Sequence, residues 1–359
     1  MTAVVQRSVD AARSPISGRV IRTRRVSVRL DARAISVVAV LAIAIVVTAA
    51  WSISVGDFPI PIRDVVRAVF STASDDAEFI VETLRLPRVL TAIMVGAAFG
   101  ISGGIFQSLA NNPLASPDIV GFNAGAALGA VFMIVAVEGA GSLEVSLGAM
   151  AGGIATAALV YVFAWKRGVH GYRLILVGIG IGFAVSAVVD YLLTRAQIYD
   201  AQRAAVWLTG SLNGRGWEHV RPVGFGLLLL VPIAAVLSRQ LRLLELGTDT
   251  AAALGVRVGR ARLGLVLVGV ALAALATASA GPIGFVALVS PPIARRLVRA
   301  PGFTLVPTAL VGALLTVAAD LVARRIMAPT ELPVGIATAV VGAPYLLWLL
   351  TREIRTGAM

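Results

Sequence analysis

The sequence contains no cysteine, a single lysine and two histidines among its 359 residues. Without cysteine the chain has no disulfide, thiolate metal site or cysteine nucleophile. His170 and His219 lie too far apart in the sequence to predict a histidine-rich metal cage. A phosphate-binding loop needs a glycine directly before its lysine, but the only lysine, Lys166, follows a tryptophan. We therefore expect the chain to hold no metal or cofactor and not to act as an ATPase by itself.

Charged residues are also scarce, at 14%, whereas hydrophobic residues make up 58% and the mean hydropathy is +0.90. A soluble domain is about 25% charged, so this chain has too few charges to cover the surface of a soluble globule. It is also too hydrophobic for a disordered chain. The basic residues behind the net charge of +12 lie between apolar runs. That distribution is typical of cytoplasmic loops rather than of a surface that binds nucleic acid.

Ten apolar runs follow one another along the chain, and each is close to the roughly 20 residues that a membrane-spanning helix needs. The sequence therefore predicts an all-α membrane protein with ten transmembrane helices. The eighth run contains Pro291 and Pro292, so we expect that segment to be bent and packed against other helices. The runs are 34–55, 89–110, 119–137, 143–164, 173–194, 220–238, 263–281, 282–298, 304–323 and 333–351.

The distribution of arginine and lysine predicts the orientation of these helices, because basic residues favour the cytoplasmic side. With both termini cytoplasmic, the inside segments hold 21 basic residues and the outside segments hold 10. Residues 1–33 are then an arginine-rich cytoplasmic tail, and 34–352 form the ten-helix domain. Its longest cytoplasmic loop is 240–260, and 353–359 form a second cytoplasmic tail. The first run is longer than a usual signal-peptide core, so we interpret it as an uncleaved span.

Glycine recurs every four residues in the second run, at Gly96, Gly100 and Gly104. Small residues at this spacing line one stripe of a helix and allow the backbones of neighbouring helices to approach closely. The sequence therefore predicts a compact bundle, without distinguishing a transporter from a membrane enzyme.

Three polar stretches interrupt the apolar pattern, and each allows two interpretations. Residues 84–88 place Arg85 and Arg88 on the outside, as interfacial anchors or as a docking point for an acidic partner or anionic ligand. Residues 111–118 form a short inside loop, which is a tight helix–helix turn or a constriction at the inner mouth of a pathway. Residues 243–256 predict a short cytoplasmic helix, which lies in the interface or contacts a soluble protein.

Charged residues inside apolar spans are costly and therefore mark candidate sites. Asp320 lies four residues before Arg324, the spacing of a helical ion pair, so we expect it to orient Arg324. For Asp190 the sequence leaves packing and a pathway-lining role open. Trp207 and Trp217 can line the mouth of a pathway, although interfacial anchoring is the more common use of tryptophan.

At these same stretches the chain resembles the FecCD-type permeases of ABC importers, which carry iron–siderophore complexes, haem and cobalamin. The resemblance covers about residues 35–352, and its finer features are most similar to the second permease subunit of ferric-enterobactin-type importers. The motifs are LRLPRVL at 84–90, GAAFGISGGIFQSLANNPLASPDIVGFNAG at 96–125, WLTGSLNG at 207–214, LLELGTDTAAALGV at 243–256, ADLVARR at 319–325 and ELPVGIATAVVGAP at 331–344.

The resemblance implies a bundle like that of the vitamin B12 and iron–siderophore importer permeases, in the bacterial inner (plasma) membrane. Two permease subunits would form a central pathway, here a heterodimer with a paralogue or a pair of identical copies. Two ABC ATPase subunits would use ATP and magnesium on the cytoplasmic side. A substrate-binding lipoprotein or periplasmic protein would dock outside. The chain itself would be a non-catalytic subunit surrounded by lipid and would bind no nucleic acid.

The family's functional positions carry over to three groups of residues in this sequence. The family commonly has His where Pro292 stands and Arg where Asn111 stands, so roles of those two side chains do not transfer. The resemblance implies that Arg85, Arg88 and Arg324 receive carboxylates of the binding protein, that Asn112, Pro113 and Leu114 form part of the cytoplasmic gate, and that Leu244, Glu245, Gly247, Asp249, Leu254 and Gly255 couple the permease to the ATPase.

The sequence and the resemblance together favour the permease subunit of an ATP-driven importer of ferric siderophore. Haem and cobalamin are alternatives within the same class. A secondary transporter would place ionisable residues near the bilayer midplane, and the centres of the ten runs lack them. An intramembrane enzyme would need a catalytic set, for which two histidines outside the spans and no cysteine equip the chain poorly.

Overall fold

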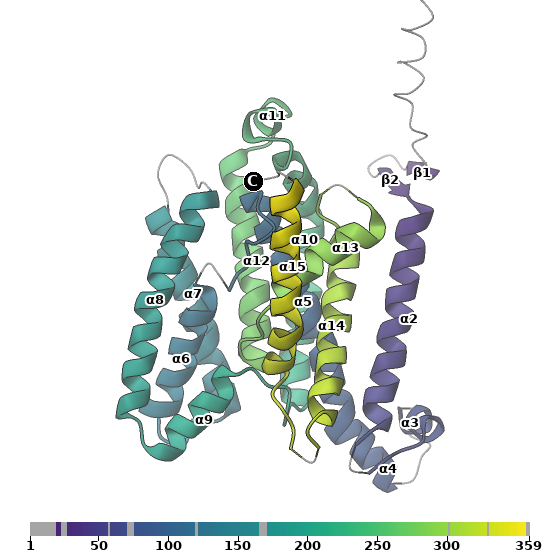
Figure 1. The fold of residues 1–359 in the computed structure, drawn as a ribbon, viewed down its shortest axis with the longest axis vertical. Helices are drawn as coiled ribbons and strands as arrows, with labels where there is room; N and C mark the ends of the chain where they lie inside the picture. Colours follow the sequence, from purple (N-terminus) through teal and green to yellow (C-terminus); the bar gives the residue numbers. More distant parts are fainter. Residues whose placement is uncertain are drawn as a thin grey trace, which may run out of the picture.

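The computed structural model describes residues 19–22, 27–56, 58–69, 75–118, 121–164, 171–300, 302–328 and 330–356. Long helices run side by side and form a bundle (Figure 1). They are α2 (Ala32–Ser54), α5 (Leu86–Ala110), α6 (Phe122–Ala136), α7 (Ser142–Ala164), α8 (Gly171–Arg195), α10 (Trp217–Leu244), α12 (Val258–Ala280), α13 (Val286–Val298), α14 (Leu305–Arg325) and α15 (Val334–Thr356).

Shorter elements cap the two ends of this bundle. The strands β1 (Arg19–Arg22) and β2 (Ser27–Leu30) form a small antiparallel hairpin in which Arg19 pairs with Leu30. The hairpin lies within the predicted tail 1–33, of which residues 1–18 and 23–26 are outside the described residues. The short helices are α3 (Ile62–Val69), α4 (Asp75–Phe79), the π-helix η1 (Ile80–Arg85), α9 (Ile198–Leu208) and α11 (Thr248–Ala253).

Each of the ten predicted apolar runs contains a helix, but the helices differ in length. Seven among the described residues are long and apolar enough to cross a membrane, namely α2, α5 together with α4 and η1 before it, α7, α8, α10, α12 and α14. The apolar part of α15 is shorter, and α6 and α13 have 15 and 13 residues. At about 1.5 Å per residue, α13 is roughly 20 Å long, short of a hydrocarbon core of about 30 Å. The all-helical membrane fold is therefore confirmed, and the count of ten complete spans stays a prediction.

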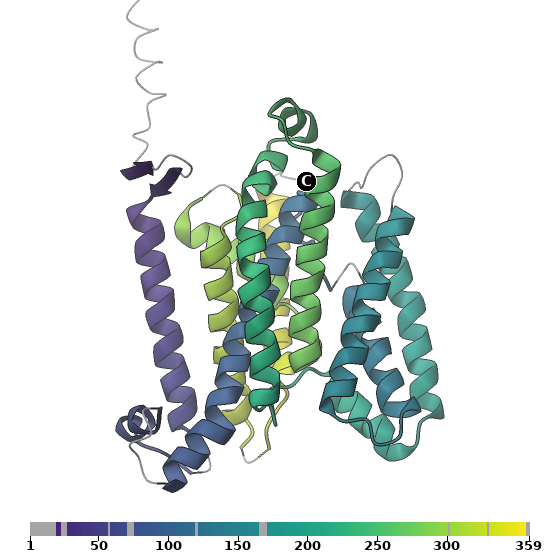
Figure 2. The same ribbon diagram turned by 180° about the vertical axis from the view of Figure 1, so that it is seen from behind.

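The small elements separate the two ends of the bundle. The β1–β2 hairpin, α11 and the C-terminus lie at one end, which we call the α11 end (Figures 1 and 2). The helices α3, α4 and α9 lie at the opposite end, which we call the α9 end. Both termini of the described chain are therefore on the same side, as the distribution of basic residues predicted.

Helix α5 is the centre of the largest of four hydrophobic clusters among the described residues and contacts α10, α12, α13 and α14. The predicted glycine stripe of α5 packs against the backbone of α14. A Cβ atom on Gly96 would lie 2.3 Å from the Gly312 carbonyl oxygen, and one on Gly100 would lie 2.6 Å from the Thr308 carbonyl oxygen, both on α14. Gly103, outside the predicted stripe, packs on α13, where an added Cβ atom would lie 1.8 Å from the Ala287 carbonyl oxygen. The second core lies among α6, α7, α8, α9 and one side of α12. The absence of side chains at these glycines therefore allows α13 and α14 to pack directly on the α5 backbone.

The eighth run remains helical across its two prolines, and the predicted bend there stays a prediction. Helix α13 continues through Pro291 and Pro292, and the irregular segment is 281–285, where Phe285 has a φ of 67°. Pro292 lacks the N–H that would bond the Leu288 carbonyl, and Gln107 Nε2 on α5 donates to that oxygen at 2.8 Å. A neighbouring side chain thus satisfies the backbone carbonyl that the proline leaves free, and the helix continues past it. The expected burial of this segment against other helices is confirmed.

Candidate functional site

The predicted docking arginine Arg88 is buried at the α9 end and has two carboxylate partners. Its Nη2 donates to Asp320 Oδ1 at 2.9 Å, and its Nη1 donates to Glu331 Oε2 at 2.9 Å. Asp320 lies on α14 and is itself buried, whereas the side chain of Glu331 is 38% exposed. The guanidinium therefore connects α5 to α14 and to the loop before α15.

Arg324 joins the same cluster from one helical turn beyond Asp320. Its Nε lies 3.3 Å from Asp320 Oδ2, which confirms the predicted ion pair at spacing four. Its Nη2 also donates to the Ser52 carbonyl of α2 at 3.2 Å. The sequence did not indicate that Asp320 binds Arg88 as well, because those two residues are 232 positions apart. One carboxylate therefore orients two of the three predicted docking arginines.

Arg85 is half-buried and donates hydrogen bonds to two backbone oxygens. Its Nη1 donates to the Ile53 carbonyl at 2.6 Å, and its Nη2 donates to the Phe58 carbonyl at 2.7 Å. The three predicted arginines therefore gather at the α9 end, and each has partners within the chain. Their role as receivers of a partner's carboxylates stays a prediction.

The predicted gate residues form a closed turn at the α11 end. Asn111 ends α5 with a φ of 47°, and the Asn112 backbone N–H donates to the Gln107 carbonyl at 3.1 Å. The side-chain oxygen Oδ1 of Asn112 accepts from the backbone N–H of Leu114 at 2.9 Å. Asn112, Pro113 and Leu114 are only partly buried. The turn interpretation of this stretch is therefore correct, and its role as a constriction stays a prediction.

Further along the same connection, Asp118 is a partly buried carboxylic acid held by Asn123. Loss of solvent around the carboxyl raises the pKa of Asp118 to about 7, although the hydrogen bond from Asn123 Nδ2, at 2.7 Å, acts in the opposite direction. The Asn123 side chain also accepts from Thr277 Oγ1 of α12 at 3.4 Å. Asp118 is thus a titratable group between the gate turn and α6.

The predicted coupling helix is present as α11 and projects from the end of the bundle (Figures 1 and 2). Gly247 and Gly255 flank it with φ values of 105° and 85°, which permits sharp turns on both sides. Asp249 and Leu254 are exposed, whereas Leu244 is buried in the main core. The helix therefore presents polar and apolar side chains outward on a base that is fixed in the bundle.

Glu245 connects the base of α11 to the segment that follows α13. Its Oε1 accepts from the Phe303 backbone N–H at 3.1 Å. On α13, Arg295 Nη2 donates to Gln107 Oε1 at 3.2 Å, directly before the gate turn. Glu245, Arg295 and Gln107 line one cavity of about 600 Å³ together with Asn111, Asn112 and Pro113. The structure therefore brings predicted coupling and gate residues to the same place.

A second cavity, of about 640 Å³, lies at the α9 end. Trp207 of α9 lines it, whereas the Trp217 Nε1–H donates to the Glu82 carbonyl at 2.9 Å and fixes α10 to η1. The other residues that line it are Ile134, Ser142, Val145, Ser146, Arg203, Val206, Ser211, Asn213, Gly214, Arg215, Glu331, Leu332 and Pro333. Trp207 is therefore placed at a cavity, and Trp217 is an anchor between two elements.

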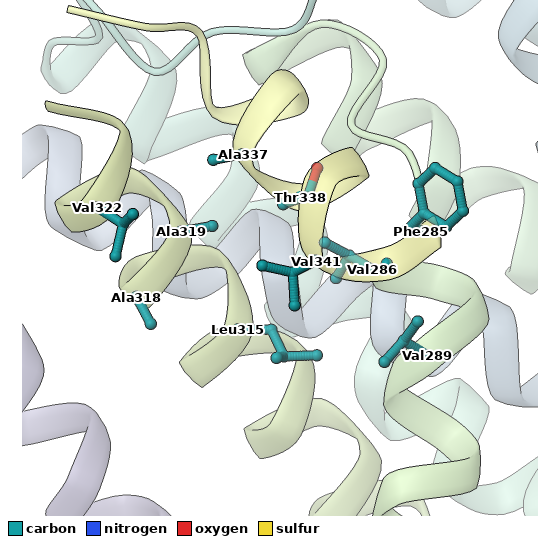
Figure 3. Close-up of a pocket in the computed structure, with 11 residues that line it drawn as sticks. Phe285, Val286, Val289, Leu315, Ala318, Ala319, Val322, Ala337, Thr338 and Val341 are labelled. Atoms are coloured by element: carbon teal, nitrogen blue, oxygen red, sulfur yellow. The ribbon is translucent and has the colours of Figure 1, made fainter. Parts of the chain in front are cut away.

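A third hollow is apolar and lies among α13, α14 and α15 (Figure 3). Its volume is about 160 Å³, and side chains such as Leu315, Val289 and Val341 point into it. No charged residue lines it, so the chemistry of this hollow suits only an apolar group.

Asp190 lies elsewhere, exposed on α8, and its role stays open. Within the described ranges, no group of three or more histidines or carboxylates is arranged to hold a metal ion.

Comparison with known proteins shows the family of the chain and supports the arrangement of its helices. The sequence profile of the FecCD transport family matches residues 42–352. The chain belongs to this family. The ferric enterobactin transport system permease of Escherichia coli K12 is 45% identical over 87% of this chain and 94% of its own length. The achromobactin transport system permease of Dickeya dadantii is 40% identical over 89% and 91%.

A solved structure supports the fold of this FecCD-family chain. An inward-facing metal-chelate type ABC transporter matches with a TM-score of 0.79 and 31% identity, over 88% of this chain and 99% of that one. The predicted family and the predicted similarity to ferric-enterobactin-type importers are therefore confirmed.

The residues that sequence reasoning missed have partners far away in the sequence. Gln107 is a lone amide within an apolar helix, and that isolation was the available signal for an interhelical hydrogen bond. Glu331 directly follows Pro329 and Thr330 in the sequence and carries a charge shortly before an apolar helix. Arg203 and Arg215 were counted only as outside charges, and nothing in their spacing indicated that they line one cavity.

Proposed function

We propose that this FecCD-family chain is the transmembrane permease subunit of an ATP-driven importer of ferric siderophores. The similarity to the ferric enterobactin permease, which covers nearly the whole of both chains, carries this conclusion. Other relatives are described as permeases for achromobactin and for iron(III) citrate. The names of these relatives refer to iron chelates, which favours a ferric siderophore over haem or cobalamin.

The two ends of the bundle have different partners in this proposal. The α11 end faces the cytoplasm, because the basic residues are concentrated in the segments of that side. Two ATPase subunits bind there and use ATP and magnesium, so this chain is not itself an enzyme. A substrate-binding protein docks at the α9 end near Arg85, Arg88 and Arg324. A second permease subunit, a paralogue or an identical copy, completes the pathway in the bacterial inner membrane.

The contacts at the α11 end provide a route between α11 and the gate turn. Movement of α11 displaces Glu245, whose carboxylate holds the Phe303 backbone N–H. The loop at Phe303 follows α13, and Arg295 of α13 holds Gln107 one turn before Asn111. ATP binding in a partner shifts the bundle between two states only if the partner binds them with different affinities. A difference in the partner's affinity for the two states would reach the gate turn through these contacts.

Iron uptake by reconstituted vesicles tests this proposal. The permease, its partner permease, the ATPase and the binding protein are placed in vesicles, and radioactive ferric siderophore is supplied. Uptake should require the ATPase subunit and hydrolysable ATP, and vanadate should inhibit it. Uptake driven by an ion gradient without ATPase would instead identify a secondary transporter.

A further inference from the structure

Two guanidinium groups in the wall of the cavity at the α9 end determine what this cavity can bind. Arg203 of α9 and Arg215 of the following loop both line it. Among the described residues, neither arginine lies within ion-pair distance of a carboxylate. The acidic residue in the same wall, Glu331, is bonded to Arg88 instead. The cavity therefore has an excess of positive charge.

Neutral acceptors hold both guanidinium groups in place. Arg203 Nη2 donates to the Ala140 carbonyl, and Arg215 Nε donates to the Ser211 carbonyl at 3.3 Å. Arg215 Nη1 lies 2.9 Å from His219 Nε2, and because a guanidinium only donates, Nε2 is the acceptor. These contacts orient the two cations without neutralising them, which is the arrangement of a pre-organised anion site.

Burial makes the charge of Arg215 costly when no anion is present. Loss of solvent lowers the pKa of Arg215, and the more distant charge of Glu218 only partly offsets this effect. An anion brought into the cavity would form charge-assisted hydrogen bonds with the free N–H groups, which are the stronger kind.

The rest of the wall suits a small, partly aromatic ligand. Ser142, Ser146, Ser211 and Asn213 provide hydroxyl and amide groups, and Trp207 provides an indole ring. The volume of about 640 Å³ is within the range of roughly 300–1,000 Å³ that small-molecule sites occupy. The lining therefore combines a few fixed polar groups with an apolar surface.

We propose that this cavity is a binding subsite for the ionised oxygen groups, catecholate or carboxylate, of an anionic metal chelate. Arg203 and Arg215 bind these oxygens, and Trp207 provides an aromatic contact. The subsite rests on the proposed import function, because an importer receives its cargo at this end. It adds that the permease itself selects for anionic cargo, in addition to any selection by the binding protein.

Direct binding to the purified permease–ATPase complex, without binding protein, tests this subsite. Equilibrium dialysis is performed with radioactive iron(III) as the anionic tris-catecholate complex and as the uncharged tris-acetohydroxamate complex. The anionic chelate should bind saturably and the uncharged one should not. Arg203→Gln and Arg215→Gln should each weaken binding by about tenfold, the effect of losing one charge-assisted contact. The matched control is Arg221→Gln, an exposed arginine that does not line the cavity, and it should bind as the wild type does.

Two results would overturn the subsite, namely equal binding of both chelates, or an Arg203→Gln complex that binds as tightly as Arg221→Gln. Arg203→Gln decides the question even if Arg215→Gln fails to assemble, because Arg203 is exposed. Iron uptake by the wild-type importer tests the import function separately from the subsite. Absence of any uptake rejects the import function, whereas normal uptake with unchanged chelate binding in Arg203→Gln rejects only the subsite.

Discussion

At the scale of single residues, Asp320 forms ion pairs with two of the arginines at the α9 end. Its buried carboxylate binds Arg88 of α5 and Arg324 of its own helix. A guanidinium that loses this partner remains buried with weaker compensation, from Glu331 for Arg88 and from the Ser52 carbonyl for Arg324. Breaking a buried pair costs about 3–5 kcal/mol. These arginines therefore stabilise the fold whatever else they bind, and charge reversal at Arg88 is not a clean test of docking.

Asp320→Asn should therefore lower the free energy of unfolding by about 3 kcal/mol. Thermal unfolding of the purified complex measures the effect. The matched variant is Glu331→Gln, which removes the outer, 38% exposed carboxylate of Arg88. It should cost about 1 kcal/mol or less, because exposed ion pairs contribute little. Equal destabilisation by the two variants would contradict the central position of Asp320.

Asp118 gives the stability of the complex a pH dependence. Its pKa is about 7 in the folded chain, against an ordinary value of 3.8, so folding favours the neutral carboxyl. The stabilisation is complete below pH 3.8 and is lost as the pH rises toward and through 7. Asp118→Asn is neutral at every pH and should raise the unfolding temperature relative to wild type more at pH 8 than at pH 5. A constant difference between these pH values would contradict a raised pKa of the Asp118 carboxyl in the folded chain.

At the scale of elements, the sequence predicted which segments are helices better than how those helices meet. Each apolar run ends at polar or glycine-rich residues, and those boundaries are local signals, so ten helices and α11 could be located. The continuation of α13 through Pro292 depends on Gln107, which lies 185 residues earlier in the chain. The Arg88–Asp320 pair and the cavity lined by Arg203 and Arg215 could not be predicted either, because these residues also lie apart in the sequence. Such contacts depend on helix packing, which a single sequence does not display.

The connection between α11 and the segment after α13 predicts a coupling defect in Glu245→Ala. The variant loses the acceptor of the Phe303 N–H, a charge-assisted bond that contributes about 1.5 kcal/mol or more. Iron imported per ATP hydrolysed should fall by about tenfold, while the ATPase rate is retained. Glu245→Gln keeps an oxygen acceptor and should lose much less. Identical coupling ratios in the alanine variant and the wild type would rule out this connection.

The turn at Gly255 tests whether α11 contacts the ATPase. Apart from its chain neighbours, nothing lies within 4 Å of a Cβ atom added at Gly255, so a large side chain there would project outward and meet no other element, although the φ of 85° strains the backbone of most residues other than glycine. Gly255→Trp should block assembly with the ATPase or uncouple hydrolysis from uptake. Gly255→Asn is the control, because asparagine tolerates the positive φ of 85° and is small. Normal assembly and transport by Gly255→Trp would remove α11 from the contact surface.

At the scale of the whole molecule, the bundle has two chemically different ends joined by α5. Its first turns carry Arg88 in the charge cluster of the α9 end, and its last turn carries Gln107 beside the gate. The chelate subsite lies at the first end, and α11 projects from the second (Figure 1). This arrangement predicts a fixed direction of transport, with cargo entering at the α9 end and ATP acting at the α11 end.

Iron uptake into vesicles of known orientation tests this direction. Importers are reconstituted in both orientations, and ATP is placed only inside or only outside the vesicles. Binding protein loaded with ferric siderophore is supplied outside. ATP enclosed inside should drive accumulation of iron, because it reaches only those importers whose α11 end faces the interior. Equal accumulation with ATP only outside, or accumulation without the ATPase subunits, would contradict an importer loaded at one end and driven from the other.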